Sequence, residues 1–182
     1  CFKCTPATVY FPFAEEPAYR YARPAMDWFL AQRFEPRVCS APARAYVAPD
    51  GATKSNTFII WRDGEPEDFE LKVEYRITAA GNSGINYRSA VVPDKVTPSN
   101  RFAMRGYQCD IDGQRRYTGN NYEEKGRLFL AVRGQMTRIT GARKPIIVAA
   151  LGDADELGKA VTDEWNSVHI IARGNVLMHL IN

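Results

Sequence analysis

The chain has 182 residues, a length that fits one compact domain built around a single hydrophobic core. Hydrophobic residues make up 45% and charged residues 25%, which excludes wholesale disorder and a fibrous repeat. The net charge of +3 is small and the charges are interspersed, so we expect no nucleic-acid partner. The longest aliphatic run, residues 146–151, is far shorter than the roughly 18 residues of a membrane span, and no transmembrane segment is expected.

Composition divides the chain near residue 55. Seven of the eleven prolines precede that point and twelve of the thirteen glycines follow it. Residues 1–55 are therefore expected to form an irregular, Pro-rich segment packed on the rest, with one short helix at residues 25–32. Residues 56–182 show short alternating runs separated by glycine-containing turns, which indicates an all-β domain, an antiparallel sandwich or barrel.

The clearest strand is predicted at residues 69–78, where ten residues alternate between apolar and polar without a miss. Such alternation is typical of a strand with one face on the core and one on solvent. Shorter runs predict further strands at residues 57–61, 85–89, 102–112, 128–132 and 145–150, and one or two helical turns at residues 153–161.

A hairpin is predicted near the C-terminal end of the sequence. Gly174 followed by Asn175 suits a two-residue turn with positive φ at its first position, which sets Ile170 opposite His179. In that register His169 and His179 point to opposite faces, which disfavours a shared metal site. His179 has apolar neighbours and is expected to be a structural histidine.

The four cysteines, Cys1, Cys4, Cys39 and Cys109, leave two interpretations open. Their even number permits two disulfides. Cys1 and Cys4 have the spacing of half a zinc site, but no second close pair follows. Cys109 lies in an alternating run, which favours a buried, inert thiol. Because residue 1 is neither Met nor the start of an apolar signal segment, we expect a processed or trimmed chain.

Polar side chains line one face of two predicted strands. The first strand carries Asn86 and Arg88 on that face, and the second carries Gln108, Asp110 and Asp112. If the strands are neighbours, we expect Arg88 to meet the two carboxylates across a shared face. Such a cluster can bind a polyhydroxylated ligand, coordinate a divalent metal or move protons. A solvated face with a surface ion pair is the structural alternative.

The turn-rich residues 116–124 are predicted to form a loop rich in hydrogen-bonding groups. Tyr117 and Tyr122 there suit sugar recognition, because tyrosine offers an apolar ring and a polar hydroxyl, although an ordinary polar loop fits equally well. The chain has no Gly-x-Ser-x-Gly elbow, phosphate-binding loop or dinucleotide fingerprint, and the residues after Asp110 lack the later ligands of an EF-hand.

Residues 68–76 and the following Asn82-Ser83-Gly84-Ile85-Asn86-Tyr87-Arg88 resemble the 3-keto-disaccharide hydrolase family. Further landmarks follow in order at residues 105–112, 117–119, 165–166 and 174–182, so the resemblance covers residues 56–182. It implies a concanavalin-like jelly-roll sandwich in an exported protein, periplasmic or extracellular. Residues 1–55 lack the family's usual opening and family members normally continue past the equivalent of Asn182, so we expect terminal strands to be lacking.

The resemblance implies cleavage of 3-keto-glycosides, including 3-keto-disaccharides, by proton abstraction at C2, elimination and hydration. This chemistry needs a base, a positive group or metal near the enolate oxygen, and an acid near the leaving oxygen. The candidate catalytic residues are Asp110, Asp112, Arg88 and Tyr117. The candidate substrate-binding residues are Asn82, Asn86, Gln108, Tyr122 and Glu124.

Several roles stay open at this point. Asp110 or Asp112 is the base or a metal ligand, Arg88 the enolate stabiliser, and Tyr117 or Tyr122 the proton donor. A divalent cation is a candidate cofactor, because oxygen ligands favour such ions. The alternative functions are a non-catalytic, lectin-like carbohydrate-binding module and an adhesion or structural domain without a ligand.

Overall fold

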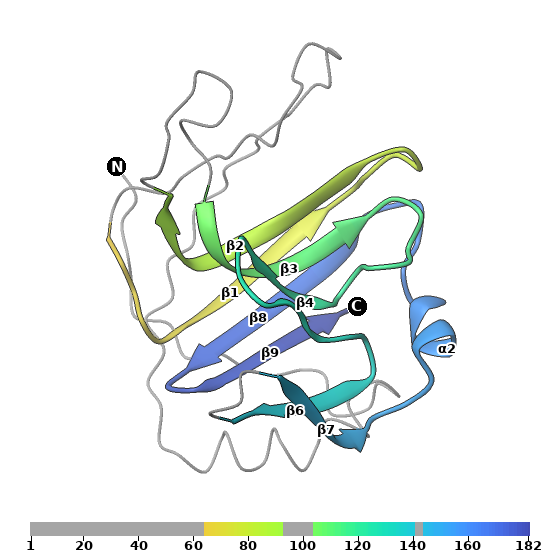
Figure 1. Ribbon diagram of the computed structural model, residues 1–182. Helices are drawn as coiled ribbons and strands as arrows, with labels where there is room; N and C mark the ends of the chain where they lie inside the picture. The colour runs from red at the N-terminus through yellow and green to blue at the C-terminus, as the bar shows by residue number, and fades with distance from the viewer. Residues whose placement is uncertain (1–63, 93–103, 141–143) are drawn as a thin grey trace, which may run out of the picture.

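The computed structural model describes residues 64–92, 104–140 and 144–182, and these form strands with one short helix (Figure 1). The expected helix at residues 25–32 and strand at residues 57–61 lie outside this part of the chain. The elements, in order, are β1 (Phe69–Tyr75), β2 (Asn82–Val91), β3 (Met104–Asp112), β4 (Asn121–Glu124), β5 (Leu128–Ala131), β6 (Gln135–Ile139), β7 (Pro145–Ala150), α2 (Ala154–Gly158), β8 (Asn166–Arg173) and β9 (Val176–Ile181).

Two antiparallel sheets form the layers of a sandwich. One sheet has the strand order β1-β8-β9 and the other the order β2-β3-β4-β5, while β6 and β7 form a separate two-stranded ribbon. Figure 1 shows the two sheets overlying each other, with α2 beside them. The expected all-β antiparallel sandwich is confirmed.

The core lies between the two sheets. It is built from the alternate side chains that each strand turns inward, with members from both layers: Tyr87, Cys109, Ile111, Val168, Ile170 and Ala172. Cys109 is 0% exposed, and burial raises the pKa of its thiol to about 12. The prediction of a buried thiol is therefore confirmed, and the raised pKa agrees with the expectation that it is inert.

The β8–β9 hairpin has the predicted register. Ile170 pairs with His179, and Gly174 in the turn has a φ of 50°. His179 faces the core side, where the Tyr87 hydroxyl lies 2.8 Å from its Nε2 and burial lowers its pKa to about 4. His169 bonds instead to Glu70, with 3.0 Å between Nε2 and Oε2. The two histidines thus have separate surroundings and structural contacts, as expected.

Some strands differ from the sequence-based expectations, and β6 lies where no strand was predicted. β1 ends at Tyr75 rather than at residue 78, and its polar face is not wholly solvated, because the Glu70 side chain is only 8% exposed beside His169. β4 lies within the segment predicted as a loop. Its Asn-Tyr-Glu-Glu sequence has little strand preference, so its pairing with β3 on one side and β5 on the other decides its conformation.

The predicted helical turns are present as α2. The carboxylate of Asp153 caps this helix by accepting hydrogen bonds from the backbone N–H groups of Asp155 and Glu156. Among the described residues, no helix has the length and apolar character that crossing a membrane requires.

Candidate functional site

One row of side chains crosses the four-stranded sheet. Asn86 of β2 pairs with Gln108 of β3, Gln108 with Tyr122 of β4, and Tyr122 with Phe129 of β5. Residues directly opposite each other in antiparallel strands point to the same face of the sheet. Because Tyr87 and Cys109, next to this row, face the core, the row lies on the face turned away from the core. We call this the outer face.

Asp110 lies on the outer face, two residues along β3 from Gln108. The Gln108 Nε2 donates a hydrogen bond of 2.5 Å to Asp110 Oδ1. Burial raises the pKa of Asp110 to about 6; the Gln108 hydrogen bond opposes this shift, and the negative charges of Asp112 and Glu124 add to it. A carboxyl group that titrates this close to neutrality suits proton transfer.

Gly84 provides the space that Gln108 needs to reach Asp110. Gly84 pairs with Asp110, and a Cβ atom at position 84 would lie 2.6 Å from Cδ and 2.7 Å from Cγ of Gln108. The Gln108 side chain therefore lies across the bare backbone of Gly84. A glycine at this position is required by the close approach rather than by a turn.

Three aromatic rings extend the outer face beyond Gln108. The rings of Tyr117 and Phe129 stack with centroids 5.7 Å apart, and Tyr122 meets Phe129 edge-to-face at 5.1 Å. Tyr117 and Phe129 are 45% and 42% exposed. Burial raises the pKa of the Tyr122 hydroxyl, and the negative charges of Glu124 and Asp110 raise it further. This hydroxyl is therefore kept protonated beside the carboxylates.

Phe129 was not among the sequence-predicted site residues. It lies in a predicted strand between exposed Leu128 and buried Leu130, and because these neighbours are all apolar, the sequence pattern did not show that the Phe129 ring is exposed. Its place beside Tyr122 depends on the pairing of β4 with β5, and the segment of β4 was predicted as a loop.

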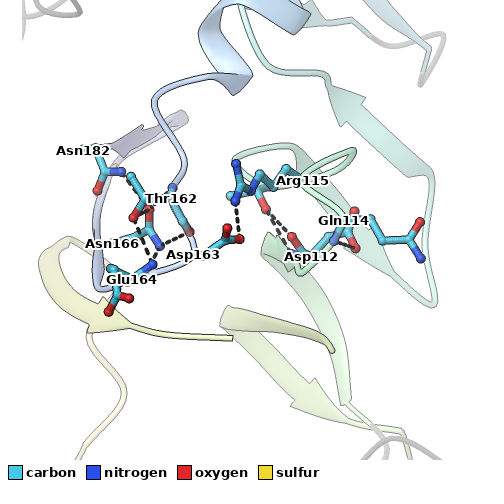
Figure 2. Close-up of polar contacts among 9 residues, drawn as sticks. Asp112, Gln114, Arg115, Thr162, Asp163, Glu164, Asn166 and Asn182 are labelled. Carbon is cyan, nitrogen blue, oxygen red and sulfur yellow. Dashed lines mark hydrogen bonds and ion pairs between the residues drawn. The ribbon is translucent and has the colours of Figure 1, made fainter. Parts of the chain in front are cut away.

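Asp112 lies at the end of β3 and is buried, at 9% exposure. Its Oδ1 accepts a hydrogen bond from the backbone N–H of Gln114 at 3.1 Å, and its Oδ2 accepts from the N–H groups of Arg116 at 2.9 Å and Tyr117 at 3.3 Å. Figure 2 shows Asp112 turned toward this loop. Asp112 thus anchors the loop that carries Tyr117, which corrects the expectation of a carboxylate open to substrate.

The same contacts bear on the candidate divalent cation. Both carboxylate oxygens of Asp112 already accept backbone N–H groups, so Asp110 and Asp112 do not form a paired oxygen site. Within the described residues, no three His, Cys, Asp or Glu side chains are grouped to hold a metal ion. The donor set on this face therefore does not fit the expected cation.

Arg88 does not meet the carboxylates, contrary to expectation. The pairing of β2 with β3 shifts between Tyr87 and Ala90, and Arg88 has a φ of 46° in this bulge. Its guanidinium donates hydrogen bonds to Glu67 O at 2.7 Å, Gly174 O at 2.6 Å and Asp68 Oδ1 at 3.1 Å. Because a bulge breaks the alternation of side chains, Arg88 leaves the face of Asn86 and ties β2 to the β8–β9 turn.

The remaining predicted residues occupy the outer face or its edge. Glu124 pairs across from Gly106 and shares the face of Tyr122. Asn82 is exposed at the start of β2, opposite Asp112. The Nδ2 of Asn86 is buried and has no hydrogen-bond partner among the residues that the structure describes, so this donor is left unsatisfied there.

The family model described as a 3-keto-alpha-glucoside-1,2-lyase-like domain matches residues 32–182. The chain belongs to this family. The match confirms the resemblance found from the sequence and begins upstream of the compositional division near residue 55. No curated protein and no solved structure matches the chain.

One landmark of the lyase-like domain is structural rather than part of the outer face. Asn166, which follows Trp165, is buried; its Oδ1 accepts from Thr162 N at 2.8 Å and from Asn182 Nδ2 at 2.8 Å. Its Nδ2 donates to the carbonyl groups of Thr162 and Glu164. As Figure 2 shows, these contacts hold the segment before β8 against Asn182, which follows β9.

Proposed function

We propose that this lyase-like domain cleaves 3-keto-glycosides, including 3-keto-disaccharides, on its outer face, with Asp110 as the general base. The observation that carries the proposal is the Asp110 carboxyl group, whose pKa is raised to about 6 among amide and aromatic side chains. The family match supports the reaction class. Substrates of this kind offer hydroxyl groups to the amides and an apolar ring face to the aromatic residues.

The reaction follows from the ketone. A carbonyl group at C3 acidifies the C2–H, so Asp110 takes that proton and the electron pair forms an enolate between C2 and C3. The enolate then expels the oxygen substituent from C1, which leaves as an alcohol once it has gained a proton. Addition of water to the resulting enone, with OH at C1 and H at C2, completes a net hydrolysis.

Two further residues fit the remaining roles. The Tyr122 hydroxyl has a raised pKa and lies near Asp110, so it remains a proton donor for the leaving oxygen. The Nδ2 of Asn86 has no partner among the described residues, and it would donate to the C3 oxygen, as negative charge grows there, once this buried side chain turns toward the substrate. Asn86 takes the stabilising role expected of Arg88, whose guanidinium is occupied elsewhere.

A lectin-like carbohydrate-binding module is the second candidate. The exposed stack of Tyr117 and Phe129 favours it, because such a surface binds sugars without any acid–base chemistry. The two candidates differ in whether the carboxyl group of Asp110 is needed after the sugar has bound.

Substitution Asp110→Asn tests the proposal on a 3-keto-disaccharide. It preserves size and hydrogen bonding but removes the basic carboxylate, so turnover should fall by about 10²–10⁴-fold while binding survives. Release of the leaving sugar and calorimetric binding measure the two effects, with the exposed Glu65→Gln as the matched control. Full turnover by Asp110→Asn contradicts the base assignment. Binding without any cleavage by the unsubstituted protein favours the lectin.

The pH dependence gives a second readout from the same protein. Only the ionised carboxylate accepts a proton, so kcat/KM should rise as the pH increases through about 6, the pKa of Asp110. Initial rates between pH 4 and 8 measure this limb, and the residual activity of Asp110→Asn should lack it. A limb near the usual carboxyl range, or one that persists in Asp110→Asn, argues against Asp110.

A further inference from the structure

The exposed stack of Tyr117 and Phe129 has no role in the proton transfer assigned to Asp110. The two rings lie nearly parallel, with 28° between their planes, and both keep over two fifths of their surface exposed. Tyr122 supports Phe129 from one side at 69°. A flat, partly exposed aromatic surface of this kind is suited to the apolar face of a ring.

The stack also lies at a definite position relative to Asp110. Phe129 pairs with Tyr122, and Tyr122 pairs with Gln108, which bonds to Asp110. Neighbouring strands are about 4.8 Å apart, so the backbone of Phe129 lies roughly 10 Å from that of Gln108. A ring on the stack would therefore lie beside, and not on top of, a ring whose C2 faces Asp110.

The stack is preorganised by contacts that do not depend on a ligand. Asp112 holds the backbone N–H groups of Arg116 and Tyr117, which fixes the loop from which Tyr117 projects. Phe129 belongs to β5, so its backbone is held by pairing with β4. A surface fixed in this way loses little conformational entropy when a ligand packs against it.

We propose that Tyr117 and Phe129 form a subsite for the leaving sugar of a 3-keto-disaccharide, next to the 3-keto ring held at Asp110. This inference rests on the proposed function and narrows its substrate class to glycosides whose leaving group is itself a sugar ring. Tyr117 then acts as a binding residue, and the proton donor is Tyr122.

The test compares two substrates that differ only in the leaving group. A 3-keto-disaccharide has a second ring to place on the stack, whereas methyl 3-keto-glucoside has only a methyl group. Phe129→Leu keeps apolar bulk on β5 but removes the flat ring. It should lower kcat/KM about tenfold for the disaccharide and less than about twofold for the methyl glycoside.

The matched control is Trp165→Leu, which removes another exposed aromatic ring; Trp165 is 59% exposed, and the Arg76 guanidinium lies over its ring. This substitution should leave kcat/KM unchanged for both substrates. Thermal unfolding of each variant separates loss of folding from loss of the subsite, and Tyr117→Leu provides a second variant on a different element. Equal losses on both substrates, or no loss on either, would overturn the subsite.

Failure of the subsite and failure of the proposed function give different results. If the unsubstituted protein cleaves both substrates and Phe129→Leu behaves like it, only the subsite is wrong. If the unsubstituted protein cleaves neither, the proposed function is wrong, and calorimetric binding then tests the subsite: weaker binding of the disaccharide alone by Phe129→Leu supports it, and unchanged binding overturns it. A dimer that Phe129→Leu converts to monomer assigns the stack to a second copy of the chain and overturns it too.

Discussion

Asp110 has its raised pKa because of where its neighbours lie. Burial and the charges of Asp112 and Glu124 disfavour the ionised form, and the Gln108 amide partly restores it. That amide reaches the carboxylate because Gly84 has no side chain in the way. The balance between these effects leaves the carboxyl group able to exchange a proton near neutral pH.

Gly84→Ala should therefore change the pKa of Asp110 indirectly, by displacing Gln108. The added methyl group displaces Gln108, and loss of its hydrogen bond removes an interaction that favours the charged form. The pKa of Asp110 should then rise, so the limb of kcat/KM that increases with pH should move to higher pH.

Rates between pH 4 and 9 measure that shift, with Ser83→Ala at the adjacent exposed position of β2 as control. Gln108→Leu should move the limb in the same direction. A lower rate at every pH with an unmoved limb would show that Gly84 acts only on the fold.

At the scale of single elements, the bulge in β2 decides which residues share a face. Up to Tyr87 the strand alternates regularly, and Asn86 lies on the outer face with Gln108. Beyond it, the shift in pairing carries Arg88 to the β8–β9 turn, where Asp68 Oδ1 also accepts a hydrogen bond from Gly174 N at 2.8 Å. One inserted residue thus turns an expected catalytic group into a link between the two sheets.

Arg88→Ala should consequently destabilise the protein while leaving turnover of a 3-keto-glycoside intact. Three hydrogen bonds are lost, and because Asp68 is partly exposed we expect the free energy of unfolding to fall by about 1–3 kcal/mol. Arg88→Lys should restore little, because an ammonium group lacks the forked donors of a guanidinium.

Urea unfolding at pH 7 measures the effect. The control is Arg76→Ala, whose ion pair with Glu164 is exposed and should contribute less than about 1 kcal/mol. Unchanged stability together with lost turnover would show instead that Arg88 takes part in the reaction.

At the scale of the whole molecule, both sheets depend on one core. Ile170 of β8 is 0% exposed and belongs to the same cluster as Tyr87, Cys109 and Ile111 of the facing sheet. The outer face is carried by the strands whose inner side chains form this core. Stability of the core and geometry of the site are therefore linked through β2 and β3.

Ile170→Ala should lower the free energy of unfolding by about 2–5 kcal/mol, because it leaves a cavity between the sheets. Ile147→Ala in β7 is the control: Ile147 is 58% exposed, and its loss should change stability by only about 0.5 kcal/mol. Chemical denaturation followed by circular dichroism gives both values. Equal effects of the two substitutions would contradict a shared core at Ile170.

The sequence by itself determined the fold class, the positions of most strands along the chain and the pairing within one hairpin. Period-two alternation in β1 and the Gly174-Asn175 turn of the β8–β9 hairpin are local signals, because burial of one strand face and the geometry of a two-residue turn depend on neighbouring residues. The same local reasoning identified Asp110 and Gln108 as polar groups on one face. The division at residue 55 and the exported location stay predictions.

Only the tertiary structure decided which polar residues lie together on the outer face. Alternation cannot reveal a bulge, so Arg88 was expected beside Asp110, and it cannot show that the Asp112 carboxylate is occupied by backbone N–H groups of the next loop. Phe129 joined the outer face only through the pairing of β4 with β5. These outcomes depend on register between strands and on contacts distant in sequence, which the local pattern of side chains does not encode.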